Sequence, residues 1–236
     1  GCSSAPEDPA EAPTDPAGSE ETVAAGDWPR TFENTDGTVT EIPAQPERIV
    51  STTVTATGTL LAIDAPVVGS TSAANGQYFA QWADIADEQG VENLFTLGEV
   101  DLEAIIAQDP DLIVVARGGA DSLVDNVAEL SDIAPTIVID YGEVTWQELA
   151  QELGTATGLE AEATAAVAEY DQHVAEAAAK ITVPEGTANI FSFNGPGEHN
   201  NIARAGSVHG DVLTSLGFTL EDPPIEWHTI EEERAD

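Results

Sequence analysis

Arginine is the side chain that points most directly to a binding function here, because basic residues are scarce. Six of the 236 residues are Lys or Arg, against 44 Asp or Glu. Arg117 directly follows the unbroken apolar run 112–116 and precedes two glycines, and Arg204 lies in the loop after a later apolar run. A guanidinium offers planar N–H donors that suit an anion with many oxygen acceptors. Both arginines are therefore predicted to bind an anionic ligand; the alternative for Arg117 is an ion pair with a nearby acid such as Asp121.

Other polar side chains fall at the ends of predicted strands. Open parallel sheets bind their ligands just outside the carboxyl ends of the strands. In chain order, the residues at these positions are Thr53, Ser70, Arg117, Tyr141 and Asn194. We expect Thr53, Tyr141 and Asn194 to line a ligand site together with the two arginines.

Metal binding and catalysis find less support in the sequence. Histidine and carboxylate side chains suit transition metals, and the candidates are Glu198, His199, His209 and His228. Their spacing matches no compact metal motif, so exposed loop histidines are favoured, and neither a metal nor a resident cofactor is predicted. The sequence has no Gly-x-Ser-x-Gly motif, no phosphate-binding loop with its lysine and no cysteine except Cys2. We expect a binding protein and no catalytic residues; the alternative is a metal-dependent enzyme that uses these histidines.

The charge balance excludes several classes of partner. With six basic and 44 acidic residues, the formal net charge is −38. Such a charge rules out a nucleic-acid binder that depends on a broad basic surface, and it disfavours electrostatic docking on an anionic membrane. A single cysteine allows no disulfide within the chain. No apolar run approaches the roughly 20 residues of a membrane-spanning helix.

The first part of the chain, residues 1–27, has the composition of a disordered tail. It contains four prolines and seven acids but no basic residue, so it cannot bury enough apolar surface to offset the entropy of ordering. Gly1 followed by Cys2 is similar to the processing site of bacterial lipoproteins. We expect a lipid on Cys2 to anchor a soluble, extracytoplasmic body to the cell membrane. The alternative is a chain boundary that happens to include a cysteine.

Strand and helix signals alternate along residues 28–158, which predicts an α/β lobe built on a parallel sheet. A hairpin is expected over 31–42, around an Asp-Gly turn. Strands are expected near 48–53, 66–69, 112–116 and 136–139. Helices are expected near 57–63, 78–86, 100–107, 123–133 and 146–153. The run 112–116 is apolar at every position, which is typical of a strand buried on both faces.

A single long helix is expected after this lobe. Residues 159–183 contain neither Gly nor Pro, and apolar side chains recur at spacings of three or four. A helix over 159–181 would extend about 34 Å at 1.5 Å per residue. That length exceeds what a crossover within one sheet needs, so the helix is predicted to join two lobes.

The remaining residues, 184–236, are expected to form only part of a second α/β lobe. They contain one clear strand at 189–193, a short extension at Ile202 and one helix at 211–216. A lone strand and helix cannot cover their own apolar faces. The predicted fold therefore has two parallel-sheet lobes bridged by a single long helix, with the second lobe truncated. A small helical cap on a one-lobed protein is the alternative.

Several stretches are similar to the iron-complex solute-binding proteins of ABC importers. The resemblance rests on PERIV at 46–50, AQDPDLIVV at 107–115, GSVHGDVL at 206–213 and LGF at 216–218. The stretches that most resemble members binding ferric enterobactin lie at 27–30, 60–67, 81–82 and 133–136. The resemblance extends from about residue 27 to residue 218, and it is more specific than any one motif.

This resemblance implies two α/β lobes bridged by one long helix, with the ligand in the cleft. It also implies a receptor, expected to be monomeric, that captures a ferric catecholate siderophore such as ferric enterobactin and delivers it to an ABC permease. The siderophore is then a transported ligand. Two positions depart from the family: Val208 replaces a basic residue of some relatives, and Gly58 replaces a glutamate that one relative pattern uses for permease docking. A haem- or cobalamin-binding relative and a purely structural lipoprotein are the alternatives.

Overall fold

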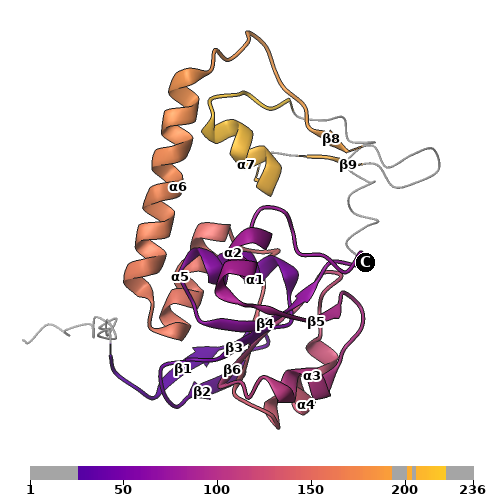
Figure 1. Ribbon diagram of the computed structural model, residues 1–236. Coiled ribbons are helices and arrows are strands. Elements are labelled where there is room, and N and C mark those ends of the chain that lie inside the picture. Colours follow the sequence, from indigo (N-terminus) through magenta and orange to yellow (C-terminus); the bar gives the residue numbers. More distant parts are fainter. Residues whose placement is uncertain (1–25, 193–200, 204–205, 222–236) are drawn as a thin grey trace, which may run out of the picture.

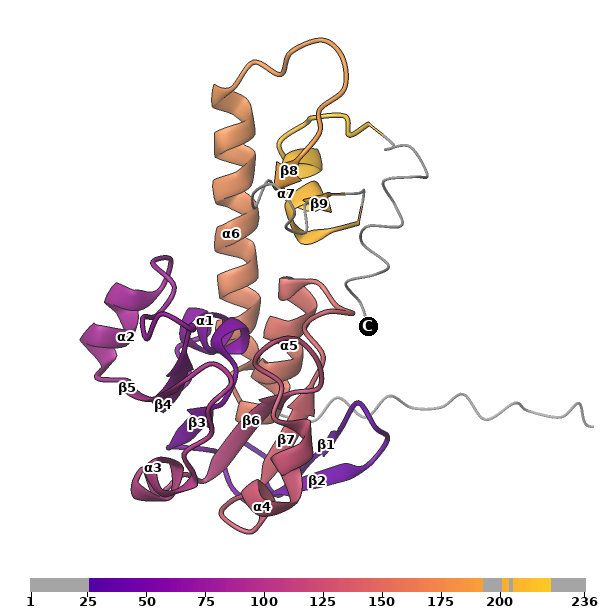
Figure 2. The ribbon, with the colours of Figure 1, turned by 90° about the vertical axis from the view of Figure 1, so that its right-hand side faces the viewer.

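The computed structural model describes residues 26–192, 201–203 and 206–221. It shows a lobe built around a parallel sheet, a long helix that leads away from this lobe, and a smaller region beside the far half of the helix (Figures 1 and 2). Residues 1–25, and with them Cys2, lie outside the described part, so the disorder and the lipidation of the tail stay predictions. Within the described residues, no helix is both long enough and apolar enough to span a membrane.

Five parallel strands form the sheet of the first lobe, in the order β5-β4-β3-β6-β7. Their bounds are β3 Ile49–Ser51, β4 Val67–Ser72, β5 Glu92–Thr96, β6 Leu112–Ala116 and β7 Thr136–Ile139. β6 and β7 coincide with the predicted runs, and all their residues are buried. The sequence does not predict β5, because this edge strand begins with two exposed polar residues and contains no buried one.

Helices cover both faces of the sheet. Their bounds are α1 Val54–Ala62, α2 Ala83–Gln89, α3 Leu102–Ala107, α4 Val127–Ser131 and α5 Trp146–Thr157, with a 3-10 turn at Val124–Asn126. Side chains of α1 and α5 share one apolar cluster with Val114 of β6, while those of α3 and α4 share another with Ile113 and Val115. Successive side chains of β6 thus point to opposite faces of the sheet, as they do in any strand. Because both faces are buried, each residue of β6 is apolar.

An antiparallel hairpin of β1 (Arg30–Glu33) and β2 (Val39–Ile42) lies beside the free edge of β7. Its turn contains Gly37 at a φ of 80°, as the Asp-Gly signal predicts. The side chain of Asn34 accepts a hydrogen bond from the backbone N–H of Val138 in β7. The hairpin therefore covers an edge strand whose unpaired backbone groups would otherwise be exposed.

The predicted long helix is α6 (Glu160–Lys180), which has 21 residues and a length of about 32 Å. Arg30 fixes its first turn to the first lobe. The buried guanidinium donates hydrogen bonds to the Glu160 carboxylate and to the carbonyl of Thr155, and it stacks on the ring of Trp28 at 4.6 Å. The N-terminal end of α6 thus packs on the first lobe, while the second region lies beside its C-terminal half (Figure 2).

The second region contains an antiparallel strand pair, β8 (Phe191–Ser192) and β9 (Asn201–Ile202), and the helix α7 (Val208–Ser215). A parallel sheet is predicted here. In the described residues β8 and β9 pair antiparallel, and the parallel pairing is limited to a single bridge between Ala188 and Leu220. The physical reason is the length of the connection, because residues 193–200 are fewer than the dozen or more that a parallel crossover needs. The truncation of this lobe stays a prediction.

α7 begins three residues before the predicted range 211–216. Ser207 accepts a hydrogen bond from the backbone N–H of Gly210 at 3.1 Å and caps the helix. A glycine in the first turn lowers the helix propensity of this segment, which explains why the prediction starts too late. The mixed α/β fold with its parallel sheet and long helix is otherwise confirmed.

Candidate ligand-binding site

Three of the predicted site residues lie at one edge of the sheet. Thr53, Arg117 and Tyr141 follow β3, β6 and β7. These strands are parallel neighbours, so their carboxyl ends meet at the same edge, where such sheets bind ligands. Asn194 and Arg204 lie outside the described residues, and their roles stay predictions.

A buried carboxylate joins two of these residues. Asp121 lies in the loop after β6 and is 6% exposed. One of its oxygens accepts a hydrogen bond from the Thr53 hydroxyl at 2.6 Å, and the other accepts one from the Tyr141 hydroxyl at 2.5 Å. Hydrogen bonds to a carboxylate are shorter and stronger than those between neutral groups. The sequence indicates Asp121 only as a neighbour of Arg117, because the contacts with Thr53 and Tyr141 arise from the tertiary fold.

Arg117 forms an ion pair with a different acid from the one expected. One of its terminal nitrogens lies 3.4 Å from a carboxylate oxygen of Asp140, and 58% of its side chain is exposed. The hydroxyl of Ser122 lies within hydrogen-bonding distance of the carbonyls of Ala116 and Arg117, which folds the loop back onto the strand end. Exposed ion pairs are screened by water and contribute little, so a ligand can replace Asp140 at small cost.

Burial raises the pKa of Tyr141 well above its ordinary value, and the hydrogen bond to Asp121 and the charge of that carboxylate raise it further. The charge of Asp140 acts in the same direction, while the side chain of Thr55 acts in the opposite one. The phenol is therefore protonated at neutral pH. The phenol donates its proton to Asp121, and the Thr55 side chain also hydrogen-bonds to the phenol oxygen, so the hydroxyl is held by groups of the protein itself.

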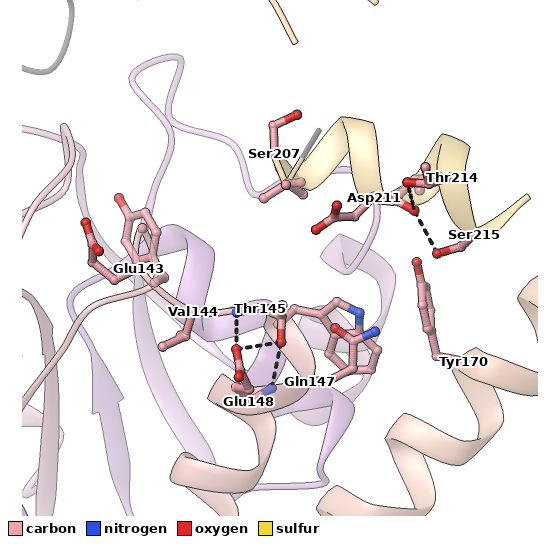
Figure 3. A pocket seen from close by; sticks show the side chains of 16 residues that line it. Glu143, Val144, Thr145, Gln147, Glu148, Tyr170, Ser207, Asp211, Thr214 and Ser215 are labelled. Carbon is pink, nitrogen blue, oxygen red and sulfur yellow. Dashed lines mark hydrogen bonds between the residues drawn. The ribbon is translucent and has the colours of Figure 1, made fainter. Parts of the chain in front are cut away.

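A cleft of about 790 Å³ opens between this edge of the first lobe and the second region (Figure 3). One wall consists of residues 141–148, which lead from β7 into the first turn of α5, and the opposite wall is formed mainly by α7. Tyr170 of α6 lies between the two walls. Pockets for small ligands measure about 300–1,000 Å³, so the cleft has the size expected for a compact organic ligand.

Aromatic rings line the cleft where α5 meets α6. Trp146 packs edge-to-face against Tyr170, with their ring centroids 4.9 Å apart. The indole N–H of Trp146 is buried and has no hydrogen-bond partner among the described residues. Neither residue is among the predicted site residues. The sequence gives only the apolar spacing of the long helix as a signal for Tyr170, and the ring contact depends on how α5 and α6 pack.

A capping box fixes the start of α5 beside the cleft. The Thr145 hydroxyl accepts a hydrogen bond from the backbone N–H of Glu148, and the Glu148 carboxylate accepts one from the backbone N–H of Thr145 (Figure 3). The backbone hydrogen bond, followed by the one from the Thr145 hydroxyl, lowers the pKa of Glu148. The Glu148 carboxylate therefore caps the N-terminus of α5 and is not expected to bind a ligand.

The opposite wall, α7, presents both apolar and polar side chains. Val208 and Val212 line the cleft, and they are 70% and 42% exposed. The hydroxyls of Thr214 and Ser215 donate hydrogen bonds to backbone carbonyls of their own helix (Figure 3). These two hydroxyl donors are therefore already used within α7.

The described lining of the cleft contains acids but neither Lys nor Arg. Its carboxylates are Glu143, Glu148 and Asp211. Among the basic residues of the described chain, Arg30 is buried at the base of α6, Arg48 precedes β3 at the opposite edge of the sheet, and Lys180 ends α6. Arg117 is therefore the described cation that lies at the cleft edge of the sheet.

The metal alternative concerns residues that are mostly outside the described part of the chain. Glu198, His199 and His228 are not described, and His209 is an exposed residue of α7. Among the residues that the structure does describe, no group of three or more His, Cys, Asp or Glu side chains is arranged to hold a metal ion.

The chain is similar to known binding proteins over most of its length. It is 39% identical over 209 residues to the ferric enterobactin-binding periplasmic protein FepB of Escherichia coli, an alignment that covers 86% of this chain and 65% of FepB. It is 28% identical over 200 residues to the probable siderophore-binding lipoprotein YfiY of Bacillus subtilis, covering 84% of this chain and 59% of YfiY. The chain thus spans less than two thirds of the length of either curated relative.

A solved structure and a family profile cover the same elements. The crystal structure of holo-ViuP matches with a TM-score of 0.80 and 48% identity, over 85% of this chain and 68% of ViuP. The profile of the periplasmic binding protein family matches residues 49–220, from β3 through the parallel sheet and α6 to the residues after α7. On this ground the chain belongs to the periplasmic binding protein family.

Proposed function

We propose that the protein captures a ferric catecholate siderophore, such as ferric enterobactin, outside the cytoplasm and delivers it to an ABC permease. The observation that carries the proposal is the cleft of about 790 Å³ between the first lobe and α7, in a chain similar to FepB, whose name states that it binds ferric enterobactin. Similarity to binding proteins supports a receptor rather than an enzyme. The chemistry is capture and release, and the siderophore is a ligand rather than a cofactor.

The aromatic residues of the cleft suit the planar rings of a catecholate. Tyr141, Trp146 and Tyr170 all line it, and an offset or edge-to-face contact between two rings contributes about 0.5–1.5 kcal/mol. Val208 and Val212 of α7 add exposed apolar surface on the other side. A bound siderophore would remove this surface from water, which favours binding in proportion to the area covered.

Arg117 is the proposed cation for the negative charge of the ferric complex. Its guanidinium is exposed, pairs with Asp140 and also acts electrostatically on Asp36, so the anion competes with weak, screened partners. Arg204 and Asn194 are proposed to contact the ligand from the second region. Thr53 is fully buried and bonded to Asp121, so its proposed contribution to the site passes through that carboxylate.

A lipid on Cys2 is the proposed membrane anchor of a monomeric receptor. The support is the sequence around Cys2, and the relative YfiY is named as a probable lipoprotein. Mass spectrometry of the N-terminal peptide, from protein isolated with the membranes of its own cells, should show Cys2 carrying acyl groups. An unmodified Cys2 in membrane-associated protein would contradict the anchor without affecting the proposed ligand.

Quenching of tryptophan fluorescence tests the ligand class. The full-length protein is titrated with ferric enterobactin and, in parallel, with haem, cobalamin, a ferric hydroxamate and ferric ion alone. We expect saturable quenching by the ferric catecholate and much weaker responses to the others. Because Trp146 lies in the wall of the cleft, Trp146→Phe should reduce the amplitude of quenching. Saturable binding of haem or cobalamin, without binding of the ferric catecholate, would overturn the proposal.

A further inference from the structure

We infer that Asp121 is a positioning residue of the ligand site, which fixes the ring of Tyr141 as a preformed wall of the cleft. This inference rests on the proposed function. Tyr141 lines the cleft, whereas Asp121 does not. The Asp121 carboxylate connects the loop after β6 to the ends of both neighbouring strands, through Thr53 after β3 and through Tyr141 after β7. One side chain therefore holds three strand ends in register at the edge where the ligand binds.

The burial of Asp121 makes these two hydrogen bonds important. The residue is 6% exposed, and Thr53 is fully buried. Burial of a carboxylate is costly unless the group is hydrogen-bonded. Arg117, the arginine of the same loop, pairs with Asp140 instead. The hydroxyls of Thr53 and Tyr141 are therefore the donors that keep Asp121 in place, and Asp121 in turn keeps the phenol in place.

The backbone approaches the Tyr141 hydroxyl from a further side. Gly119 has a φ of 91°, and a Cβ on this residue would overlap the Tyr141 hydroxyl and lie 3.1 Å from a carboxylate oxygen of Asp121. Only glycine accepts both this conformation and this approach readily. With the hydroxyl enclosed in this way, a ligand meets a ring that need not be ordered on binding, and such preorganisation favours affinity.

Affinity measurements on a double-mutant cycle test the inference. Asp121→Asn, Tyr141→Phe and the double variant are titrated with ferric enterobactin in the full-length protein, by tryptophan quenching. Asp121→Asn should weaken binding roughly tenfold, which corresponds to about 1.4 kcal/mol. In the Tyr141→Phe background the same substitution should cause little further loss, because each change weakens the one hydrogen bond between these two side chains: an amide oxygen is a poorer acceptor than a carboxylate. Unchanged affinity in Asp121→Asn, or additive losses in the double variant, would overturn the inference.

A spectroscopic readout separates positioning from a general loss of structure. The Tyr141 hydroxyl proton, protected from exchange by its bond to Asp121, should give an NMR signal that is absent in Tyr141→Phe and that exchanges faster with water in Asp121→Asn, where the acceptor is no longer charged. Asp111→Asn is the matched control, because Asp111 also accepts two hydrogen bonds, from the backbone N–H groups of Glu47 and Arg48 at the opposite edge of the sheet. It should keep both the signal and the affinity. An exchange rate of this proton that is unchanged in Asp121→Asn contradicts the inference.

The outcomes distinguish this inference from the proposed function. If the wild-type protein does not bind ferric enterobactin, the proposed function fails and the inference falls with it. If the wild type binds and Asp121→Asn binds equally well, the inference alone falls. If Asp121→Asn does not fold, Thr53→Val replaces it, since it removes one donor and keeps the carboxylate. That variant should weaken binding about threefold, with no effect in the Tyr141→Phe background, and unchanged affinity would overturn the inference.

Discussion

The two walls of the cleft are built in different ways. The first-lobe wall is tied to the core, because Asp121 fixes Tyr141 and the capping box of Thr145 and Glu148 fixes the start of α5. The α7 wall is a short helix in which Gly210 is the buried residue, while its valines are exposed. The first wall is therefore fixed by the fold, whereas the second offers apolar surface that a ligand of the proposed kind would cover.

This difference assigns selectivity and affinity to different parts of the site. A wall of fixed shape discriminates between ligands, because a misfit cannot be relieved without breaking buried hydrogen bonds. Apolar burial is not directional and increases with the area covered. Substitutions in or behind the first wall are thus expected to change stability as well as binding, and substitutions on α7 are expected to change binding with little loss of stability.

The largest effect is expected from Leu153→Ala, which removes the support behind the first wall. Leu153 of α5 is fully buried in the main apolar cluster, and loss of such a side chain lowers the free energy of unfolding by about 2–5 kcal/mol. Val212→Ala on α7 should lower it by about 0.5 kcal/mol or less. Denaturant unfolding of both variants measures the difference, and equal losses would mean that the two walls are supported alike.

A smaller effect is expected from Gly119→Ala. The new Cβ would require a strained φ and would collide with the Tyr141 hydroxyl, so we expect a loss of about 1–3 kcal/mol in stability, together with weaker ligand binding. Gly118→Ala is the control, because a Cβ at that position meets no atom within 4 Å. Thermal melts and ligand titrations of both variants test this, and identical behaviour of the two would show that the loop tolerates a side chain beside Tyr141.

Thr145→Ala should destabilise the first wall slightly, because it removes one hydrogen bond of the capping box. Loss of this N-cap costs about 1 kcal/mol of unfolding free energy. The same substitution at Thr155, an exposed position within the same helix, should change stability by about 0.5 kcal/mol or less. Urea unfolding compares the two variants. Because Ala has a higher helix propensity than Thr, a loss at Thr155 as large as that at Thr145 would mean that the effect does not come from the cap.

The contribution of the capping box should also depend on pH. Hydrogen bonds from Thr145 lower the pKa of Glu148 in the folded protein. The unfolded chain therefore binds the proton more readily, so the contribution is present above the ordinary glutamate pKa and is lost as the pH falls through the lowered value. The difference in stability between the wild type and Thr145→Ala should shrink below pH values of about 4. A difference that stays constant in a pH series of urea unfolding would contradict this.

The smallest effect is expected from Arg117→Ala. As an exposed rim cation paired with Asp140, Arg117 should contribute about 1 kcal/mol or less to siderophore affinity, with little change in the melting temperature. Arg117→Lys should recover part of the loss, because a single ammonium lacks the planar fork of donors. Titration of both variants beside thermal melts measures the two quantities. A fall in melting temperature at unchanged affinity would make Arg117 a structural ion-pair partner instead.

The sequence predicts those parts of the molecule whose signals are local. The uniformly apolar run of β6 and the Asp-Gly turn of the hairpin each carry their own pattern, and the rule for parallel strand ends places Thr53, Arg117 and Tyr141 at one edge of the sheet. β5 is not predicted, because none of its residues is buried and its sequence therefore lacks the apolar run that marks the central strands. These outcomes follow from periodicity and turn chemistry, which require no knowledge of distant contacts.

The site is harder to predict because it is formed by contacts between distant residues. Asp121 and Thr53 are 68 positions apart in the chain, and no local pattern marks an aspartate that will accept hydrogen bonds from two strand ends. The ring contact of Trp146 with Tyr170 likewise depends on the packing of α5 on α6. The rule for parallel strand ends can therefore locate the site, but it does not identify Asp121, the buried carboxylate that holds the side chains of the site in place.

The buried contacts of Arg30 with Glu160 have a mechanical consequence. α6 is a stiff rod clamped at its first-lobe end, and α7 lies beside its far half (Figures 1 and 2). A tilt of about 5° at the clamp would displace the far end of a rod about 32 Å long by about 3 Å, close to the thickness of an aromatic ring. A small change of angle at this contact, which lies outside the cleft, would thus become a large change in the distance between the walls.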